Sequence, residues 1–383
     1  MNNNKRIPFN KPSLIGKELE YITQAVNDHN HISGSGPFTH RCQDKLEESL
    51  GCDRALLTHT GTAALEIAAI LCDIQPGDEV IMPSFTFVST ANAFVLRGGI
   101  PVFVDIRPDT LNLDEKLIAS AITDKTKAIV PVHYGGMPCA MDEIMEIAKK
   151  NNLLVVEDAA QAYLSRYQDR PLGSIGDMGC VSFHETKNII SGEGGALLVN
   201  DERFVERAEI IWEKGTDRSQ FLRGDVDKYS WQDIGSSYMP SDMIAAFLFA
   251  QLEEAEKIIA SRSKTFHQYY EGLKDLENEG RVRLPHLQAG STGNGHLFYV
   301  VTRNEDECRG LMKHLATETI EAIPHYVPLH SSKAGLKFAR VSGSMQVTEE
   351  TSRHLVRLPL YYGMEEAQVV RVVTEIKNFF KKC

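Results

Sequence analysis

The chain has 383 residues, of which 42% are hydrophobic and 24% are charged, a composition typical of a globular protein with a full apolar core. Its formal net charge of −11 argues against a nucleic-acid partner, because such partners are bound mainly by neutralising phosphates with Lys and Arg. The length allows two packed domains, or one large domain with an appendage.

Cysteine usage and hydropathy indicate the compartment. The seven cysteines are an odd number without a Cys-x-x-Cys pair, so neither a disulfide framework nor a zinc ribbon is indicated. Residues 1–6 lead into polar sequence instead of the apolar segment of an export signal, and no run approaches the ~20 apolar residues that cross a bilayer. We therefore expect a cytoplasmic protein with reduced thiols and no membrane partner.

Between residues 55 and 200, short apolar runs alternate with segments of helical period. The runs predict seven strands: Ala55–Thr58, Glu79–Met82, Pro101–Ile106, Ala128–His133, Leu153–Glu157, Gly179–Phe183 and Ala196–Val199. The helical segments include Ala63–Cys72, Thr86–Leu96, Met141–Lys150 and Phe204–Trp212. This alternation predicts an α/β fold with a mostly parallel, seven-stranded sheet flanked by helices.

A second region follows a charged, helix-periodic connector from Ser241 to about Asn278. Beyond the connector we predict strands at His296–Thr302 and Thr319–Val327, helices at Asp306–Ala316 and Glu365–Lys381, and a loop at Gln288–Gly295. The expected domains are a large α/β domain over 1–245 and, over 246–383, a long connecting helix with a small α+β domain.

A phosphate site is predicted where the first strand gives way to a helix. In a parallel sheet, ligands bind beyond the carboxyl ends of the strands, and Thr60-Gly61-Thr62 stands at such an end. The free N–H groups and positive dipole end of the next helix favour a phosphate there. The alternative is ordinary helix capping by Thr60 or Thr62.

Asp158 ends an apolar strand that is expected to be buried. Because side chains alternate along a strand, Glu157 and Asp158 must face opposite sides of the sheet. A carboxylate at the edge of a core needs a positive partner, and a protonated pyridine nitrogen is one such partner. The alternative is an ion pair within the protein or a cap for the next helix.

Lys187 lies in a short connection between two strands that should be central, just before the glycine run 192–195. Most lysines are solvated surface charges, but this location favours a desolvated amine with a lowered pKa. An amine that can bind an aldehyde, with a carboxylate near the ring nitrogen, is what a pyridoxal phosphate enzyme requires. The glycine run leads into a strand and is not the Gly-x-Gly-x-x-Gly of a nucleotide-binding loop.

Aromatic and histidine side chains offer further ligand contacts. Phe87 follows a strand end, where it can stack on a planar ring or simply pack in the core. His325, Tyr326 and His330 end a predicted strand and can form the wall of a sugar or nucleotide site. No carboxylate or third ligand accompanies the two histidines, so we predict no metal site.

Several motifs, spread from about Pro8 to Tyr362, resemble the DegT/StrS-type sugar-nucleotide aminotransferases. They are Thr60–Leu65, Pro76–Ile81, Pro83–Val88, Val156–Gln161, Ser182–Asn188, Gly192–Gly195 and Tyr326–His330.

The resemblance implies a fold type I pyridoxal phosphate enzyme and a homodimer with active sites at the interface. By position, Lys187 matches the Schiff-base lysine and Asp158 the partner of the pyridine nitrogen. Other matches are Gln161 to the ring-hydroxyl contact, Phe87 to the stacking aromatic, and Gly61, Thr62, Ala63 and Ser182 to the phosphate contacts. Many relatives carry Asn after the tyrosine that matches Tyr238, where it reaches the neighbouring subunit's phosphate, but this chain has Met239.

Three motifs, His184–Asn188, Lys214–Phe221 and Asp233–Tyr238, most resemble the branch that makes dTDP-4-amino-4,6-dideoxygalactose for surface polysaccharides. That resemblance implies glutamate as donor and dTDP-4-keto-6-deoxyglucose as acceptor. The alternatives are an aminotransferase for a 3-keto or UDP-linked sugar and a non-catalytic, cofactor-binding regulator. A nicotinamide dehydrogenase is disfavoured because its glycine motif is missing.

Overall fold

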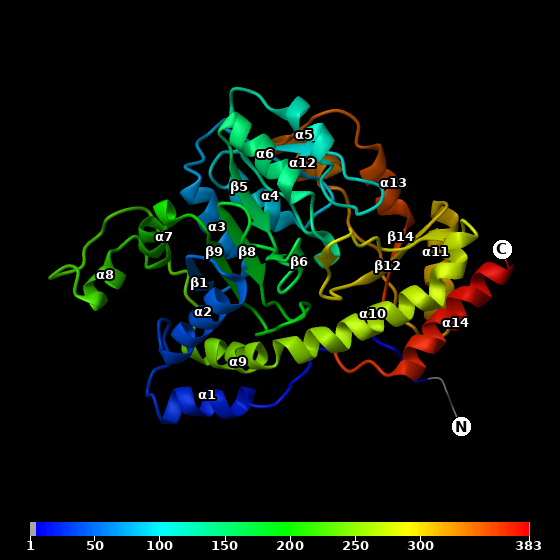
Figure 1. Cartoon of the computed structure of the whole chain (residues 1–383), viewed down its shortest axis with the longest axis horizontal. Coiled ribbons are helices and arrows are strands. Elements are labelled where there is room, and N and C mark those ends of the chain that lie inside the picture. The colour runs from blue at the N-terminus through cyan, green and yellow to red at the C-terminus, as the bar shows by residue number, and fades with distance from the viewer. Residues whose placement is uncertain (1–4, 383) are drawn as a thin grey trace.

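The computed structural model describes residues 5–382 and is built around a sheet of eight strands (Figure 1). The strands are β1 (Arg54–Thr58), β2 (Glu79–Pro83), β3 (Ile100–Val104), β4 (Thr126–Ile129), β5 (Leu154–Asp158), β8 (Met178–Ser182), β9 (Gly195–Val199) and β13 (Arg340–Val341). Across the sheet their order is β1-β9-β8-β5-β4-β2-β3-β13.

The sheet is mostly parallel, as the sequence predicts. Only β9 runs antiparallel to its two neighbours, and every other adjacent pair is parallel. All seven predicted strands are present, although β4 ends at Ile129, earlier than predicted. The eighth strand, β13, comes from the C-terminal region and was not predicted, because it is only two residues long.

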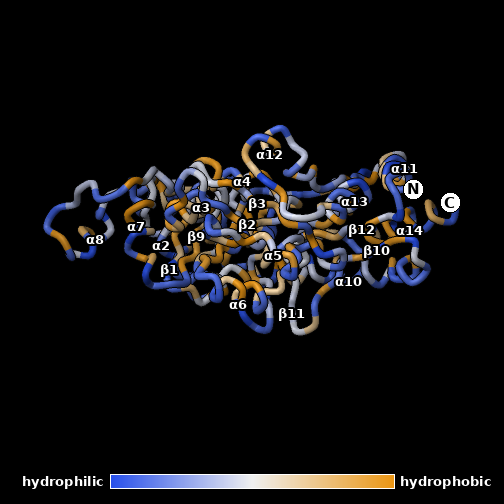
Figure 2. Tube along the Cα trace, turned by 90° about the horizontal axis from the view of Figure 1, so that it is seen from above, coloured by the Kyte–Doolittle hydropathy of each residue, from blue (hydrophilic) through white to orange (hydrophobic). Residues whose placement is uncertain are grey.

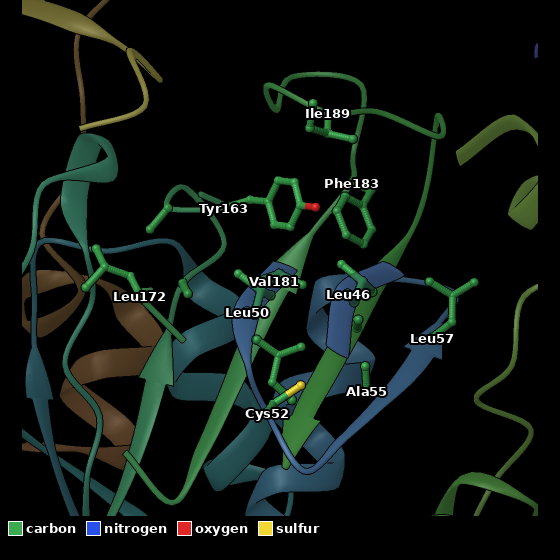
Figure 3. Packing of buried hydrophobic residues seen from close by; sticks show 14 of the residues in the cluster. Leu46, Leu50, Cys52, Ala55, Leu57, Tyr163, Leu172, Val181, Phe183 and Ile189 are labelled. Atoms are coloured by element: carbon green, nitrogen blue, oxygen red, sulfur yellow. The ribbon is translucent and has the colours of Figure 1, made fainter. Parts of the chain in front are cut away.

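Five helices cover one face of the sheet. They are α1 (Glu18–Asn27), α2 (Pro37–Leu50), α5 (Glu115–Ala121), α6 (Met141–Asn151) and α9 (Asp242–Glu253). Their apolar side chains pack with alternate strand residues such as Leu57 and Val181 into one core, in which Leu46 and Leu50 of α2 also lie (Figure 3).

Three helices cover the opposite face, namely α3 (Gly61–Leu71), α4 (Val88–Val95) and α7 (Val205–Trp212). The alternation of strand side chains separates the two cores, because Val155 packs in the first and Val156 in the second. The predicted helices are confirmed as α3, α4, α6 and α7 with small shifts of their ends.

The connector contains two helices instead of one. Helix α10 (Ala255–Asn278) follows α9 after a break at Glu254, whose φ and ψ are −105° and 11°. Helix α9 packs within the first core, whereas α10 runs toward the C-terminal region (Figure 1).

The C-terminal region is built on a three-stranded antiparallel sheet. It contains β10 (Val282–Arg283), β12 (Phe298–Thr302) and β14 (Leu355–Leu358), with β12 in the middle. The helices α11 (Glu305–Thr317) and α13 (Gln346–His354) lie against it, and α14 (Glu366–Lys382) packs on α10 and α11 in the same core. Strand β12 and helices α11 and α14 correspond to predicted elements.

The strand predicted at Thr319–Val327 is wrong. Only isolated bridges form there, from Ile320 to Ile7 and from Ile323 to Arg357. Pro324 has no N–H to donate to a ladder, which limits strand pairing in this segment. The strands that pair with β12 are β10 and β14, neither of which was predicted.

The predicted division at 245/246 stays a prediction, and three features cross it. Helix α9 packs in the core of the large sheet, and Ile7 packs in the C-terminal core with Phe298 and Ile320. Strand β13 in turn pairs with β3 of the large sheet.

Smaller elements complete the chain. They are α8 (Arg218–Arg223), α12 (Lys333–Phe338) and a small sheet of β6 (Arg166–Tyr167), β7 (Arg170–Pro171) and β11 (Ser291–Thr292). Helix α8 belongs to an arm, residues 214–237, that extends from one end of the molecule (Figure 2).

Six cysteines are buried free thiols, while Cys383 and residues 1–4, which the sequence analysis also considered, lie outside the described range. Within residues 5–382, no helix has the length and apolarity needed to cross a membrane.

Candidate active site

A cavity of about 740 Å³ opens at the carboxyl ends of β1, β5 and β8 and reaches the C-terminal sheet. This is the position expected for ligands of a parallel sheet. Its lining includes Thr60, Gly61, Thr62, Phe87, Ser89, Thr90, Asp158, Gln161, Ser182, Lys187, Arg262, His296, His325, Tyr326 and Arg357. The structure therefore brings together most residues that the sequence predicts for the site.

The N-terminus of α3 forms one end of the cavity. Thr60 is extended and its hydroxyl accepts the N–H of Ala63 at 3.0 Å, while the Thr62 and Ser89 hydroxyls lie 2.7 Å apart. A Cβ on Gly61 would lie 2.9 Å from Cβ of Ser182, so the glycine lets the Ser182 side chain approach the helix start closely. Hydroxyls and backbone N–H groups thus converge where the helix dipole favours an anion.

Asp158 is buried at the end of β5 and borders the cavity. Its Oδ2 accepts the Thr90 hydroxyl at 2.6 Å, and its Oδ1 accepts the N–H of Ala160 at 3.2 Å. These two bonds leave acceptor capacity on a carboxylate that can take about four. Asp158 can therefore still accept a donor from a ligand.

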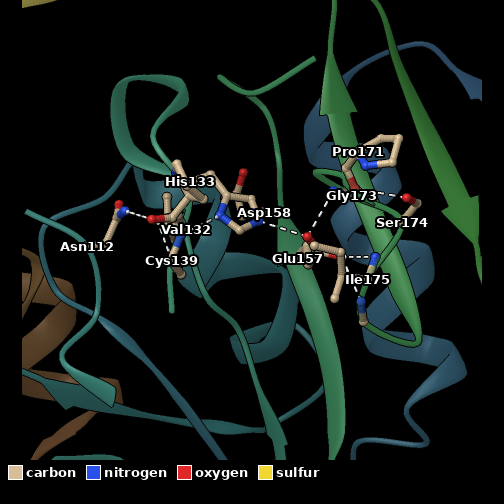
Figure 4. A network of polar contacts seen from close by, with 12 residues as sticks. Asn112, Val132, His133, Cys139, Glu157, Asp158, Pro171, Gly173, Ser174 and Ile175 are labelled. Carbon is tan, nitrogen blue, oxygen red and sulfur yellow. Dashed lines mark hydrogen bonds and ion pairs between the residues drawn. The ribbon is translucent and has the colours of Figure 1, made fainter. Parts of the chain in front are cut away.

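Glu157 faces the opposite side of β5, as the alternation predicts, and is enclosed there (Figure 4). It accepts four hydrogen bonds of 2.6 to 2.8 Å, from His133 Nε2 and from the N–H groups of Gly173, Ile175 and Gly176. Desolvation raises its pKa, but His133 and these N–H groups outweigh that effect and lower the pKa overall. Glu157 is satisfied by the protein alone.

Lys187 lies in the loop between β8 and β9 and lines the same cavity as Asp158. Desolvation lowers the pKa of Lys187 to about 8, against a smaller upward effect of the Asp158 charge. The amine is consequently easier to deprotonate than an ordinary lysine, as attack on an aldehyde requires.

Gln161, Tyr326 and His325 form a connected wall. Gln161 Nε2 donates to the Tyr326 hydroxyl at 2.9 Å, and its Oε1 accepts the N–H of Gly135 at 2.7 Å. The hydroxyl of Tyr134 lies 3.0 Å from His325 Nδ1, and desolvation lowers the pKa of His325 strongly. His325 is therefore neutral near pH 7.

Phe87 lies at the cavity as predicted, whereas Ala63 and His330 do not. Phe87 lines the cavity with its side chain 58% exposed, so it is free to contact a ligand. Ala63 and His330 are not among the lining residues. The N–H of Ala63 is used in the α3 cap, and His330 Nδ1 lies 2.8 Å from the hydroxyl of Ser84.

The residues present fit pyridoxal phosphate. The α3 start offers N–H groups and hydroxyls for a phosphate, Asp158 a carboxylate for a pyridinium, and Lys187 an amine for the aldehyde. Within residues 5–382, no group of three or more His, Cys, Asp or Glu side chains is arranged to hold a metal ion.

Four further residues that were not predicted from the sequence line the cavity, namely Thr90, His296, Arg262 and Arg357. Arg262 is buried, and desolvation lowers its pKa to about 9. A signal existed for Arg357 alone, because it is the single charge in the apolar run Leu355–Leu360.

The sheet, the helices on both faces and the cavity at the strand ends define a fold type I pyridoxal phosphate-dependent enzyme. The crystal structure of S. venezuelae DesV in complex with a ketimine intermediate superposes with a TM-score of 0.88 at 31% identity, covering 98% of each chain. The chain belongs to the DegT/DnrJ/EryC1/StrS aminotransferase family, whose model matches residues 12–377.

Curated relatives agree with this assignment. GDP-perosamine synthase of Escherichia coli O157:H7 is 32% identical, covering 98% of this chain and 99% of the relative. Spore coat polysaccharide biosynthesis protein SpsC of Bacillus subtilis is also 32% identical, covering 99% and 98%. The protein is thus a pyridoxal phosphate-dependent sugar aminotransferase that acts on an amino donor and a nucleotide-linked keto sugar.

Proposed function

We propose that this enzyme transfers the amino group of glutamate to C4 of dTDP-4-keto-6-deoxyglucose, giving dTDP-4-amino-4,6-dideoxygalactose for surface polysaccharide synthesis in the cytoplasm. The choice of sugar rests on the motifs at His184–Asn188, Lys214–Phe221 and Asp233–Tyr238. The observation that carries aminotransfer itself is the Lys187 amine, with its pKa of about 8, in one cavity with Asp158.

Each site residue then has a proposed role. Lys187 holds the cofactor and Asp158 pairs with its ring nitrogen, while Phe87 stacks on the ring and Gln161 contacts the ring hydroxyl. The phosphate is assigned to Gly61, Thr62, Ala63 and Ser182, and the sugar nucleotide to His325, Tyr326 and His330. Neither Ala63 nor His330 borders the cavity, so these two assignments rest on the family motifs.

The chemistry follows from the protein groups. When bound, pyridoxal phosphate supplies an electron sink next to the carbon that loses its proton. The freed Lys187 Nζ takes that proton from the α-carbon of glutamate, and later returns one to C4 of the sugar. Asp158 keeps its negative charge against the ring nitrogen throughout, which favours the protonated ring.

A homodimer is part of the proposal, and the arm supports it. Residues 214–237 expose several large apolar side chains, with Trp231 83% and Leu222 59% exposed. Exposed apolar patches of this kind mark surfaces that contact other proteins. Met239 has a thioether where many relatives carry Asn, so its side chain offers no N–H for the neighbouring subunit's phosphate.

Purified enzyme with glutamate and a panel of keto sugar nucleotides tests this function, with the product identified by NMR. We expect amination at C4 of the dTDP-linked 4-keto sugar. Preferred turnover of a 3-keto or UDP-linked sugar would establish that alternative instead. If glutamate leaves the cofactor absorbance unchanged and no 2-oxoglutarate forms, glutamate is not the amino donor.

Substitution of Lys187 tests the catalytic assignment. General acid–base catalysis contributes about 10²–10⁴-fold, so K187A should lose nearly all turnover while remaining folded. The matched control is K150A, because Lys150 is an exposed residue of α6. Retained turnover in folded K187A would refute the role.

A further inference from the structure

Arg357 brings a fixed positive charge to the cavity from the C-terminal sheet. It lies on β14 opposite Tyr299 of β12. On its other side the backbone donates its N–H to Ile323 O at 2.8 Å and accepts the N–H of Ile323 at 3.2 Å. Because both of its backbone groups are bonded to Ile323 and it lies within the β12–β14 ladder, Arg357 has a fixed backbone from which its guanidinium extends.

The guanidinium has few partners of its own. Nε is buried without a hydrogen-bond partner, and Nη2 donates only a long bond of 3.4 Å to Pro324 O. The ring of Phe9 lies 4.9 Å from Cζ. In the part of the chain that the structure describes, no carboxylate forms an ion pair with Arg357.

A desolvated charge without a counter-ion is costly, and burial accordingly lowers the pKa of Arg357. The other arginine of the cavity differs, because Arg262 donates to Gly295 O at 3.1 Å and to His296 O at 2.6 Å. Arg357 is therefore the arginine of this cavity that retains donors for an anionic ligand.

We propose that Arg357 binds the α-carboxylate of the amino donor through its guanidinium fork, an inference that rests on the proposed function. In an α-amino acid, the carbon that bears the reacting amine also bears this carboxylate, so its binding group must lie near Lys187. The planar guanidinium matches a carboxylate in paired hydrogen bonds.

The position of Arg357 favours the donor carboxylate over the diphosphate of the sugar nucleotide. The diphosphate is attached at C1 of the hexose, across the ring from the reacting C4, and so lies away from the amine. Arg357 in contrast lines the same cavity as Lys187 and His325, and its charge adds to the desolvation that lowers the pKa of both.

The first test compares R357M with R353M in the two half-reactions, followed by cofactor absorbance. Arg353 is an exposed residue of α13 and serves as the matched control. With R357M we expect kcat/KM for glutamate to fall about 10²-fold, because bonds to a charged group are lost. The KM for the nucleotide sugar in the second half-reaction should not change, and R353M should resemble wild type.

Donor amides locate the contact on the substrate. Wild type should prefer glutamate strongly over isoglutamine, the α-amide, and R357M should lose that preference while keeping its preference for glutamate over glutamine. Calorimetry with 2-methylglutamate, which has no α-proton to lose, should show correspondingly weaker binding to R357M. R357K, which keeps the charge without the fork, should fall between wild type and R357M.

A measurement on wild type covers the case in which the variants do not fold. Modification of Arg357 by butanedione, mapped by mass spectrometry, should be slowed by 2-methylglutamate and not by dTDP. The inference is overturned if dTDP alone protects, if R357M keeps the glutamate half-reaction, or if its KM for the sugar rises instead. Failure of wild type to convert glutamate at all would overturn the proposed function as well. That outcome differs from those that overturn only the role of Arg357.

Discussion

The two sides of β5 carry adjacent carboxylates with opposite environments. Glu157 and Asp158 are both buried, but Glu157 accepts four hydrogen bonds from the protein and Asp158 accepts two beside an open cavity. A buried carboxylate that the protein satisfies completely stabilises the fold. A buried carboxylate that keeps free acceptor capacity at a cavity, such as Asp158, is available to a ligand.

Contacts on both sides of β5 hold Asp158 in position. Glu157 ties β5 to the loop at 173–176 and to His133, so it fixes the strand end that presents Asp158 (Figure 4). On the cavity side, Thr90 of α4 orients Asp158. Substitutions on the two sides should therefore separate activity from stability.

Among substitutions on the two sides of β5, D158N should have the largest effect on activity. Loss of a charge that stabilises the reacting centre typically costs about 10²–10³-fold in kcat, and the amide cannot keep the ring nitrogen protonated. The free energy of unfolding of the cofactor-free protein, measured in urea, should change by less than about 1 kcal/mol. D124N, at an exposed position, is the control. A large loss of stability with unchanged turnover would reverse the assignment.

E157Q should lower stability and leave turnover nearly unchanged, in contrast to D158N. Its amide replaces one acceptor oxygen with a donor that faces other donors, so the free energy of unfolding should fall by about 3 kcal/mol. Turnover per folded molecule should stay within about ten-fold of wild type. E146Q, on the exposed face of α6, should be neutral in both assays. Equal stability of E157Q and wild type would contradict a structural role for Glu157.

The stabilisation by Glu157 should depend on pH. Because the folded-state pKa of Glu157 is lowered, its contribution is complete above the unfolded pKa of about 4.3 and is lost as pH falls through the lower folded value. Urea unfolding at a series of pH values should show wild type losing more stability than E157Q over this acid range. Parallel curves for the two proteins would show that the carboxylate charge contributes nothing.

The smallest effect is expected from T90V, which removes the hydroxyl that donates to Asp158 Oδ2. Turnover should fall about ten-fold, because Asp158 keeps its charge and loses only an orienting bond. T86V is the comparison, since Thr86 bonds to Thr90 and not to Asp158. If T86V lowers turnover more than T90V does, Thr90 does not orient Asp158 by itself, and the Thr86–Thr90 pair does so instead.

Local patterns predicted the scaffold and the centre of the site. Alternating apolar runs located all seven long strands of the sheet, and the ends of three of them placed Gly61, Asp158 and Lys187 around one cavity. The opposite orientation of Glu157 and Asp158 followed from strand alternation alone.

Long-range contacts account for what the sequence did not predict. The partners of Glu157, the Thr90 bond and the position of Arg357 all join residues from separate elements, and no periodicity in one segment reports such contacts. Strand β14 is four residues long and ends before Pro359, and no element was predicted there from the sequence. The motif around His330 was adjacent to site residues, yet the chain turns His330 toward Ser84.

The central claim is that Lys187 carries the cofactor. Borohydride reduction of the purified enzyme, followed by proteolysis and mass spectrometry, tests it directly. We predict a pyridoxyl phosphate adduct on Lys187 and on no other lysine. An unlabelled Lys187, or an adduct fixed on a different lysine, would contradict the assignment.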